Sequence, residues 1–92
     1  KMDKREKVKE IVLKCLHNFG KEEMISEFEN PKEKTKIQEV VDSMDLVVLS
    51  VDIEEKYAEA FEKEIKVLNE EEASFLMNFK DVETLVEYIS TL

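Results

Sequence analysis

Apolar residues recur every three or four positions along three stretches of this chain, which is the spacing of one face of an amphipathic α-helix. The first stripe lies in residues 8–19, the second starts at residue 46 and the third lies in residues 82–89. Their members are Val8, Ile11, Val12, Cys15 and Phe19; Leu46, Leu49, Ile53, Tyr57, Phe61 and Ile65; and Val82, Leu85, Val86 and Ile89. The pattern predicts an all-α domain that spans residues 1–92.

Residues that favour helix ends set the expected boundaries. Asp3 with Glu6 has the spacing of a capping box. Asp42 is suited to cap the second helix, with Asp45 as a favourable carboxylate in its first turn, and Asp81 is suited to cap the last helix. The chain's only glycine, at position 20, is expected to end the first helix. Because residues 43–67 contain no Gly or Pro, we expect a lengthened second helix of about 35 Å.

The connections contain weaker signals. Residues 20–41 form a long link, and its apolar residues could anchor it to the core: Met24, Ile25, Ile37, Val40 and, as the expected plug, Phe28. Asn30 followed by Pro31 could start a single helical turn. Asn69 with Glu72 predicts a short helix, with Ala73, Leu76 and Met77 facing inward and Phe79 anchoring the loop after it. The expected fold is a four-helix bundle with three substantial helices and one short one.

The charge and the cysteine content limit the classes of function and the cellular setting that fit this chain. The 92 residues include 14 Lys and Arg against 23 Asp and Glu, so the net charge of −9 disfavours nucleic acid and favours basic partners. A single cysteine, Cys15, cannot form an internal disulfide and is expected to be buried as a small hydrophobe. No apolar run is long enough for a signal peptide or membrane span, so we expect a cytoplasmic monomer that does not insert into membranes.

Ser43 is the residue with the most informative surroundings. It occupies the first position of the expected second helix, where its hydroxyl should be exposed. The only histidine, His17, is expected at the end of another helix, so Ser43 lacks a nearby base and is a poor catalytic nucleophile. The chain also has no metal-ligand cluster and no glycine-rich phosphate loop. An enzyme is therefore the least supported class.

The order Asp-Ser-Met-Asp at residues 42–45, with the residues that follow it, resembles the centre of the acyl carrier proteins, which usually have Asp-Ser-Leu-Asp there. The further matching positions are Leu46, Ile53, Glu54, Glu55, Tyr57 and the closing segment 81–89. The resemblance implies that a phosphopantetheinyl transferase, with magnesium in its own reaction complex, attaches 4′-phosphopantetheine from coenzyme A to Ser43. It also implies that Asp42 supports this transfer, and that the arm carries acyl groups as thioesters while the carrier itself is not an enzyme.

Two departures from the family pattern indicate a specialised carrier. About ten extra residues separate Tyr57 from Val82, and Val48 stands where the family usually has an acidic residue, five positions after the serine. The outward face of the second helix is expected to contain Met44, Asp45, Val48, Val51, Asp52 and Glu55. We interpret it as an apolar patch rimmed by carboxylates that binds acyl-loading and acyl-processing enzymes with basic or apolar patches. The alternative is that its apolar residues pack against the lengthened helix or a loop.

An acyl pocket between the helices could be lined by Leu46, Ile53, Ala60, Leu85 and Ile89, although such a stripe is more often simply core. Other functions also fit the sequence. A peptidyl or D-alanyl carrier would share the Ser43 chemistry. An unmodified acidic helical adaptor would bind basic proteins through the second helix and would not need Ser43.

Overall fold

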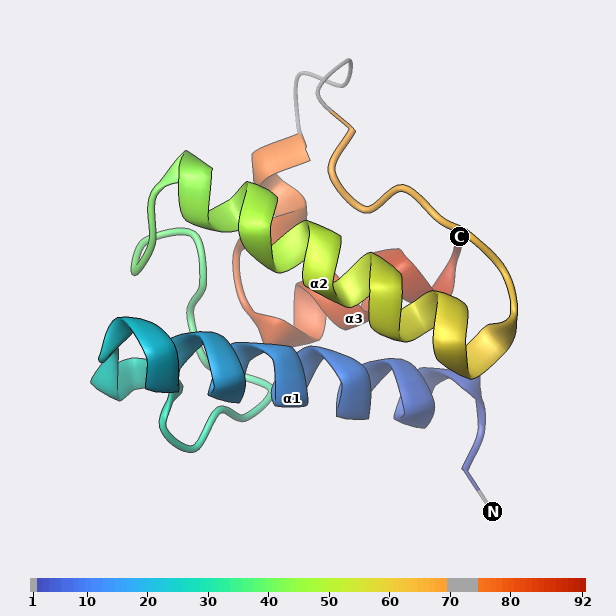
Figure 1. The fold of residues 1–92 in the computed structure, drawn as a ribbon, viewed down its shortest axis with the longest axis horizontal. Helices are drawn as coiled ribbons and strands as arrows, with labels where there is room; N and C mark the ends of the chain where they lie inside the picture. Colours follow the sequence, from blue (N-terminus) through green and yellow to red (C-terminus); the bar gives the residue numbers. More distant parts are fainter. Residues whose placement is uncertain (1, 70–74) are drawn as a thin grey trace.

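The fold was taken from a computed structural model, which describes residues 2–69 and 75–92. These residues form three α-helices and two short 3-10 helices (Figure 1): α1 (Lys4–Glu23), η1 (Ser26–Phe28), α2 (Ser43–Phe61), η2 (Phe75–Phe79) and α3 (Val82–Ser90). Within that part of the chain, β-type pairing is limited to one isolated bridge between Lys36 and Asp81. The all-α class and the three substantial helices are confirmed.

Helix α1 begins as predicted but ends later. The Asp3 side chain caps it by accepting a hydrogen bond from the Glu6 N–H at 2.9 Å. Gly20 does not end the helix, which continues to Glu23 and is followed by Met24 in the left-handed conformation, with φ of 58°. Gly20 is instead buried inside α1, where a Cβ would lie 2.5 Å from Phe28 Cβ. The glycine is therefore needed for close packing against η1, which sequence spacing does not reveal.

The connection from α1 to α2 is anchored mainly by Phe28, as predicted, and by Ile37; both side chains are fully buried. Met24 is not an anchor, because 91% of it is exposed. The chain after Asn30 makes a single hydrogen-bonded turn but no helix: the Thr35 N–H donates to the Lys32 carbonyl oxygen at 3.0 Å. The Thr35 Oγ1 in return accepts a hydrogen bond from the Lys32 N–H at 2.8 Å.

Helix α2 starts at Ser43 and is capped by Asp42, as predicted, and Asp45 completes a capping box, but the helix is shorter than expected. It ends at Phe61, and Glu62 has a left-handed φ of 55°, so its 19 residues span about 28 Å. The chain then returns alongside α2 (Figure 1), where Val67 is buried and donates its N–H to Glu54 Oε2 at 2.8 Å. A longer helix would have left Val67 without a core to pack against.

The last part of the chain follows the prediction closely. Asp81 caps α3 by accepting a hydrogen bond from the Thr84 N–H at 2.8 Å, and the predicted stripe of α3 is buried. Phe79 is a buried anchor at the end of η2. The short helix expected from Asn69 falls partly on residues 70–74, outside the described residues. Its described part, residues 75–79, is 3-10 rather than α, and Met77 is 69% exposed instead of facing inward.

Helix α1 is central to the packing because it contacts both α2 and α3 (Figure 1). Its buried residues join those of α2, α3 and the connections in one apolar core. At the edge of this core the Arg5 guanidinium pairs with Glu33 of the connection at 3.1 Å and with Glu87 of α3 at 2.6 Å. Residues 2–69 and 75–92 contain no helix that is both long and apolar enough to cross a bilayer.

Candidate functional site

The hydroxyl of Ser43 is presented at the N-terminal end of α2. Ser43 is the first residue of the helix and is exposed. The carboxylates on either side are used in the capping box: Asp42 accepts from the Asp45 N–H at 2.9 Å and Asp45 accepts from the Asp42 N–H at 3.3 Å. These two bonds fix the start of α2, so the Ser43 side chain has a defined position at the positive end of the helix dipole.

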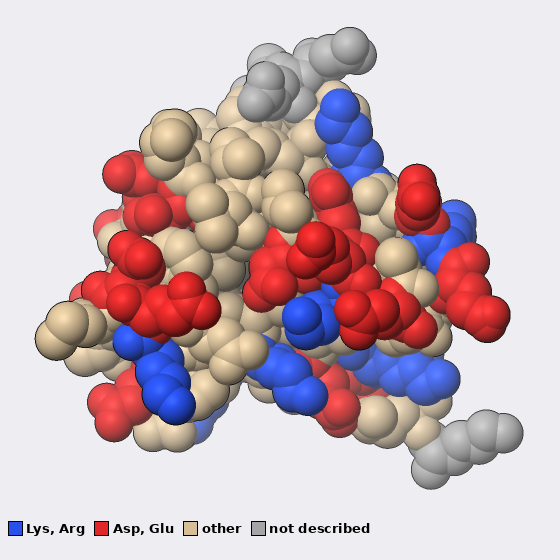
Figure 2. Space-filling model, in the orientation of Figure 1, with Lys and Arg blue, Asp and Glu red and all other residues tan. Residues whose placement is uncertain are grey.

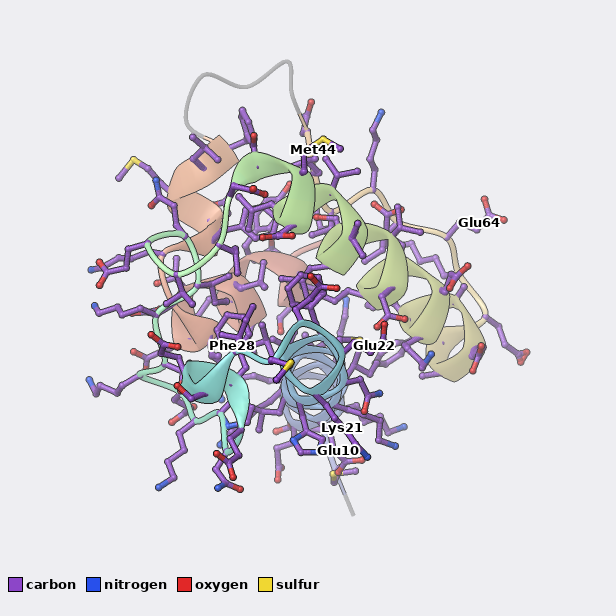
Figure 3. The ribbon with its side chains drawn as sticks, turned by 60° about the vertical axis from the view of Figure 1, so that its left-hand side comes forward. Glu10, Lys21, Glu22, Phe28, Met44 and Glu64 are labelled. Atoms are coloured by element: carbon purple, nitrogen blue, oxygen red, sulfur yellow. The ribbon has the colours of Figure 1, made fainter. Side chains whose placement is uncertain are left out.

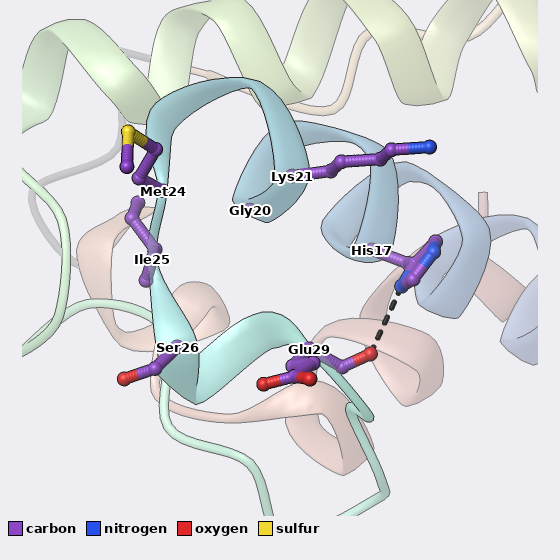
Figure 4. A pocket seen from close by; sticks show the side chains of 7 residues that line it. All are labelled: His17, Gly20, Lys21, Met24, Ile25, Ser26 and Glu29. Atoms are coloured by element: carbon purple, nitrogen blue, oxygen red, sulfur yellow. Dashed lines mark hydrogen bonds between the residues drawn. The ribbon is translucent and has the colours of Figure 1, made fainter.

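The chain's only histidine is engaged elsewhere. His17 lies on α1 and donates its Nδ1–H to the backbone carbonyl of Glu29 at 2.9 Å (Figure 4). It borders a hollow of about 390 Å³ at the C-terminal end of α1, whose other lining residues are Gly20, Lys21, Met24, Ile25, Ser26 and Glu29. Ser43 does not border this hollow. His17 therefore joins α1 to the chain that follows η1.

The start of α2 carries an exposed apolar surface. Met44 is 74% exposed, Val48 55% and Val51 50%, in agreement with the outward face predicted from periodicity. Val47, which the sequence reasoning omitted, is also 41% exposed, and its spacing of four residues from Ser43 could have indicated it. Figure 3 shows Met44 pointing away from the helices at the start of α2. The alternative was that these side chains pack against a lengthened helix or a loop; among the described residues it is not seen for Met44, Val48 and Val51, since at least half of each is exposed.

Acidic residues gather beside this apolar surface (Figure 2). A hollow of about 280 Å³ lies between α1 and α2, with Val48, Val51 and Glu55 on one side and Phe19 and Glu22 on the other. The two residues of α1 were not among the predicted partner-binding residues. Phe19 and Glu22 lie three positions apart and so share one face at the end of α1. A prediction of where α1 crosses α2 could have placed them beside this hollow.

Asp52, one of the predicted partner-binding residues, is partly buried and makes contacts within the chain. Its carboxylate lies 3.5 Å from the Lys56 Nζ and also forms a hydrogen bond with the Cys15 thiol. Burial of Cys15, reinforced by the charge of Asp52 and that hydrogen bond, raises the pKa of the thiol to about 12. Cys15 is thus a buried, protonated hydrophobe, as expected from its place on the α1 stripe. Asp52 helps to hold α2 against α1.

The predicted acyl-pocket residues do not line a common cavity among the hollows described here. Leu46, Ile53, Leu85 and Ile89 are each at most 2% exposed and belong to the continuous core. Ala60 is exposed and borders a separate surface hollow between α1 and α2. The difference follows from their places on α2, because Leu46 and Ile53 lie on its buried face whereas Ala60 is exposed in its last turn.

A different hollow, of about 390 Å³, borders the exposed face of α2 and the returning segment. Its lining includes Val47, Ser50, Val51, Glu54, Lys66 and Leu68. Sequence reasoning missed it because the segment was expected to be helical. No group of three His, Cys, Asp or Glu residues in the described part of the chain is placed to hold a metal ion.

Fold and site together define a small compact all-α protein with an exposed serine at the start of its second α-helix. Comparisons with protein family models, with curated proteins and with solved structures found no match to this chain.

Proposed function

We propose that this protein is a specialised acyl carrier that holds acyl groups as thioesters on a 4′-phosphopantetheine arm attached to Ser43. The observation that carries the proposal is the exposed Ser43 hydroxyl at the first position of α2, fixed by the Asp42 and Asp45 capping box. This is the structural setting implied by the resemblance of residues 42–57 to the centre of the acyl carrier proteins. The carrier would catalyse nothing itself.

The residues at the start of α2 fit such an arm. Transfer forms a phosphodiester between Ser43 Oγ and pantetheine, releases the nucleotide part of coenzyme A and passes the hydroxyl proton to the transferase. The phosphodiester would carry a negative charge beside the N-terminal N–H groups of α2, where the helix dipole favours an anion. Asp42 would support the transfer by holding the helix start. When bound, the arm supplies a thiol that keeps the acyl group in a reactive thioester.

The order of elements also supports a carrier. A long connection separates α1 from α2, as the family resemblance implies, and the short 3-10 helix η2 precedes α3. The extra length lies between Phe61 and Phe75, where the described residues return beside α2. With Val48 at the position where the family usually has an acidic residue, this indicates partners other than the ordinary enzymes of fatty-acid synthesis.

The partners we propose are the phosphopantetheinyl transferase and acyl-loading and acyl-processing enzymes. They would dock on the exposed face that contains Met44, Val48 and Val51, with Asp45 and Glu55 available to basic groups at its edge. The same face, with the net charge of −9, favours a second candidate function, an unmodified acidic adaptor for basic proteins. A peptidyl or D-alanyl carrier would differ from the first proposal only in its cargo and activating enzyme.

The test is intact-protein mass after incubation with coenzyme A, magnesium and each of several phosphopantetheinyl transferases of broad specificity. We expect a gain of one phosphopantetheine in the natural protein and in Ser26→Ala, which removes another exposed serine. Ser43→Ala should gain nothing. A protein that is folded by circular dichroism but unmodified by every transferase would overturn the carrier proposal and favour the adaptor. A gain that persists in Ser43→Ala would show that the wrong residue has been assigned.

A further inference from the structure

The hollow between α2 and the returning segment has an uncommon polar group at its edge. Ser50 is only 2% exposed, and its hydroxyl oxygen is buried without a hydrogen-bond partner among the described residues. Buried hydroxyls are nearly always paired, because water is lost on burial and must be replaced. Ser50 borders the hollow, so rotation about one side-chain bond can direct its hydroxyl to a ligand there.

Ser50 also lies in line with the proposed attachment site. Ser43, Val47, Ser50 and Glu54 are spaced by four, three and four residues, so they form one row along α2. Seven residues of helix place Ser50 about 10 Å from Ser43 along the axis. A phosphopantetheine arm is longer than this and contains two amide groups. A chain attached to Ser43 can therefore pass Val47 and reach the hollow.

The opposite wall of the hollow is held in place. Glu54 accepts the Val67 N–H at 2.8 Å, and the Val67 side chain is buried, so the residues on either side of it stay beside α2. Lys66 and Leu68 line the hollow from this segment. The lining thus combines apolar side chains with a hydroxyl, a carboxylate and an ammonium group, which suits a chain that alternates methylene and polar groups better than a plain hydrocarbon.

We propose that this hollow binds the chain carried on Ser43, and that Ser50 hydrogen-bonds a carbonyl, amide or hydroxyl group of that chain. The inference rests on the proposed carrier function and adds the class of cargo: chains with hydrogen-bonding oxygen or nitrogen atoms within reach of Ser50. Two parts of the chain could supply that group, namely the amides of the arm or an oxygen on the acyl group. The experiment separates these two sources.

The test attaches the chain chemically and so does not depend on any transferase. Ser43→Cys is alkylated with a haloacetyl derivative of pantetheine, of saturated acyl-pantetheine, or of 3-oxoacyl-pantetheine with the same chain length. Cys15 will not compete, because it is buried and its pKa is raised to about 12. Backbone amide NMR shifts are then compared in Ser43→Cys alone, with Ser50→Ala, and with Ser90→Ala. Ser90 is the matched control, since its hydroxyl is also buried and unpaired within the described residues but lies on α3.

We expect shift changes at Val47, Ser50, Lys66 and Leu68 on attachment, reduced by more than half in Ser50→Ala and retained in Ser90→Ala. Changes with all three chains would identify the arm amides as the source, and changes with the 3-oxo chain alone would identify the acyl oxygen. Ser50→Ala removes only an unpaired hydroxyl, so we expect it to fold. The inference is overturned if no chain shifts these amides, or if Ser50→Ala shows the same changes. Failure of a transferase to modify Ser43 would count against the carrier proposal alone.

Discussion

Replacing Gly20 with alanine sets two physical effects of opposite sign against each other. Gly20 lies inside α1, and alanine stabilises a helix by about 1 kcal/mol relative to glycine. In the folded protein, however, the new Cβ would stand 2.5 Å from Phe28 Cβ and 3.1 Å from the Ile25 carbonyl oxygen. The sign of the change in stability therefore depends on how far η1 can move.

The steric effect should be the larger one. The two carbons must separate from 2.5 Å to about 3.5 Å for ordinary contact, and Phe28 is fully buried, so η1 cannot retreat without opening the core. Overpacking of this kind costs about 1–3 kcal/mol, and we take the upper end because the contact involves a Cβ rather than a flexible side-chain tip. Subtracting the gain in helix propensity leaves a loss of about 2 kcal/mol, or about 8–16 °C in Tm for a domain of this size.

Thermal unfolding followed by circular dichroism measures this change. Asn18→Ala is the control, because Asn18 is exposed two residues earlier on the same helix and alanine there should raise Tm slightly. A Tm for Gly20→Ala equal to or above that of the natural protein would refute the packing of η1 on α1 at Gly20.

Three further changes test other parts of the structure. Val48→Glu should weaken docking of an acyl-processing partner without lowering Tm, because Val48 is 55% exposed; unchanged partner turnover would exclude Val48 from the docking surface. Cys15 should react with a thiol reagent at pH 8 only after unfolding, and fast labelling of the folded protein would contradict its burial. Because the pKa of its thiol is about 12 in the folded protein and lower in the unfolded chain, the free energy of unfolding should fall as the pH rises from about 9 toward 12. Partial burial of Asp81 opposes ionisation of its carboxyl, but hydrogen bonds from Thr84 outweigh this effect and lower the pKa of Asp81. The stabilising effect of the Asp81 carboxylate should therefore be present above about pH 4 and decline at lower pH. In urea unfolding, Asp81→Ala should cost about 1 kcal/mol at pH 7, whereas Asp81→Asn should cost less; equal losses would argue against a capping role.

Local signals in the sequence were sufficient for the starts of the helices and for much of the core. Asp3, Asp42 and Asp81 cap the helices they were predicted to cap, since capping depends on a side chain and the backbone three residues later. The exposure of Ser43 follows from the same local rule. Periodicity also placed the outward face of α2, including Met44 and Val48.

Features set by contacts between distant residues were not predictable in this way. Gly20 is explained by Phe28 of η1, and a lone glycine in sequence gives the same signal whether it ends a helix or allows close packing. Placing Phe19 at the hollow between α1 and α2 required knowledge of how the two helices cross. Ala60 was assigned to the acyl pocket because the apolar spacing continues through it, but it is exposed at the edge of a surface hollow between α1 and α2.

The early end of α2 connects the least predictable part of the fold with the proposed function. Had the helix continued to residue 67, as its composition favours, Lys66 and Leu68 would have pointed past the bundle and could not have faced Ser50. Instead Glu62 adopts the left-handed conformation, Val67 is buried and Glu54 binds its N–H, which brings the segment back along the row that starts at Ser43. Burial of Val67 and this hydrogen bond offset the helical bonds that residues 62–67 give up. Lys66 and Leu68, from the lengthened stretch between Tyr57 and Val82, therefore line the hollow, and under the proposed function the cargo is expected to differ where the fold does.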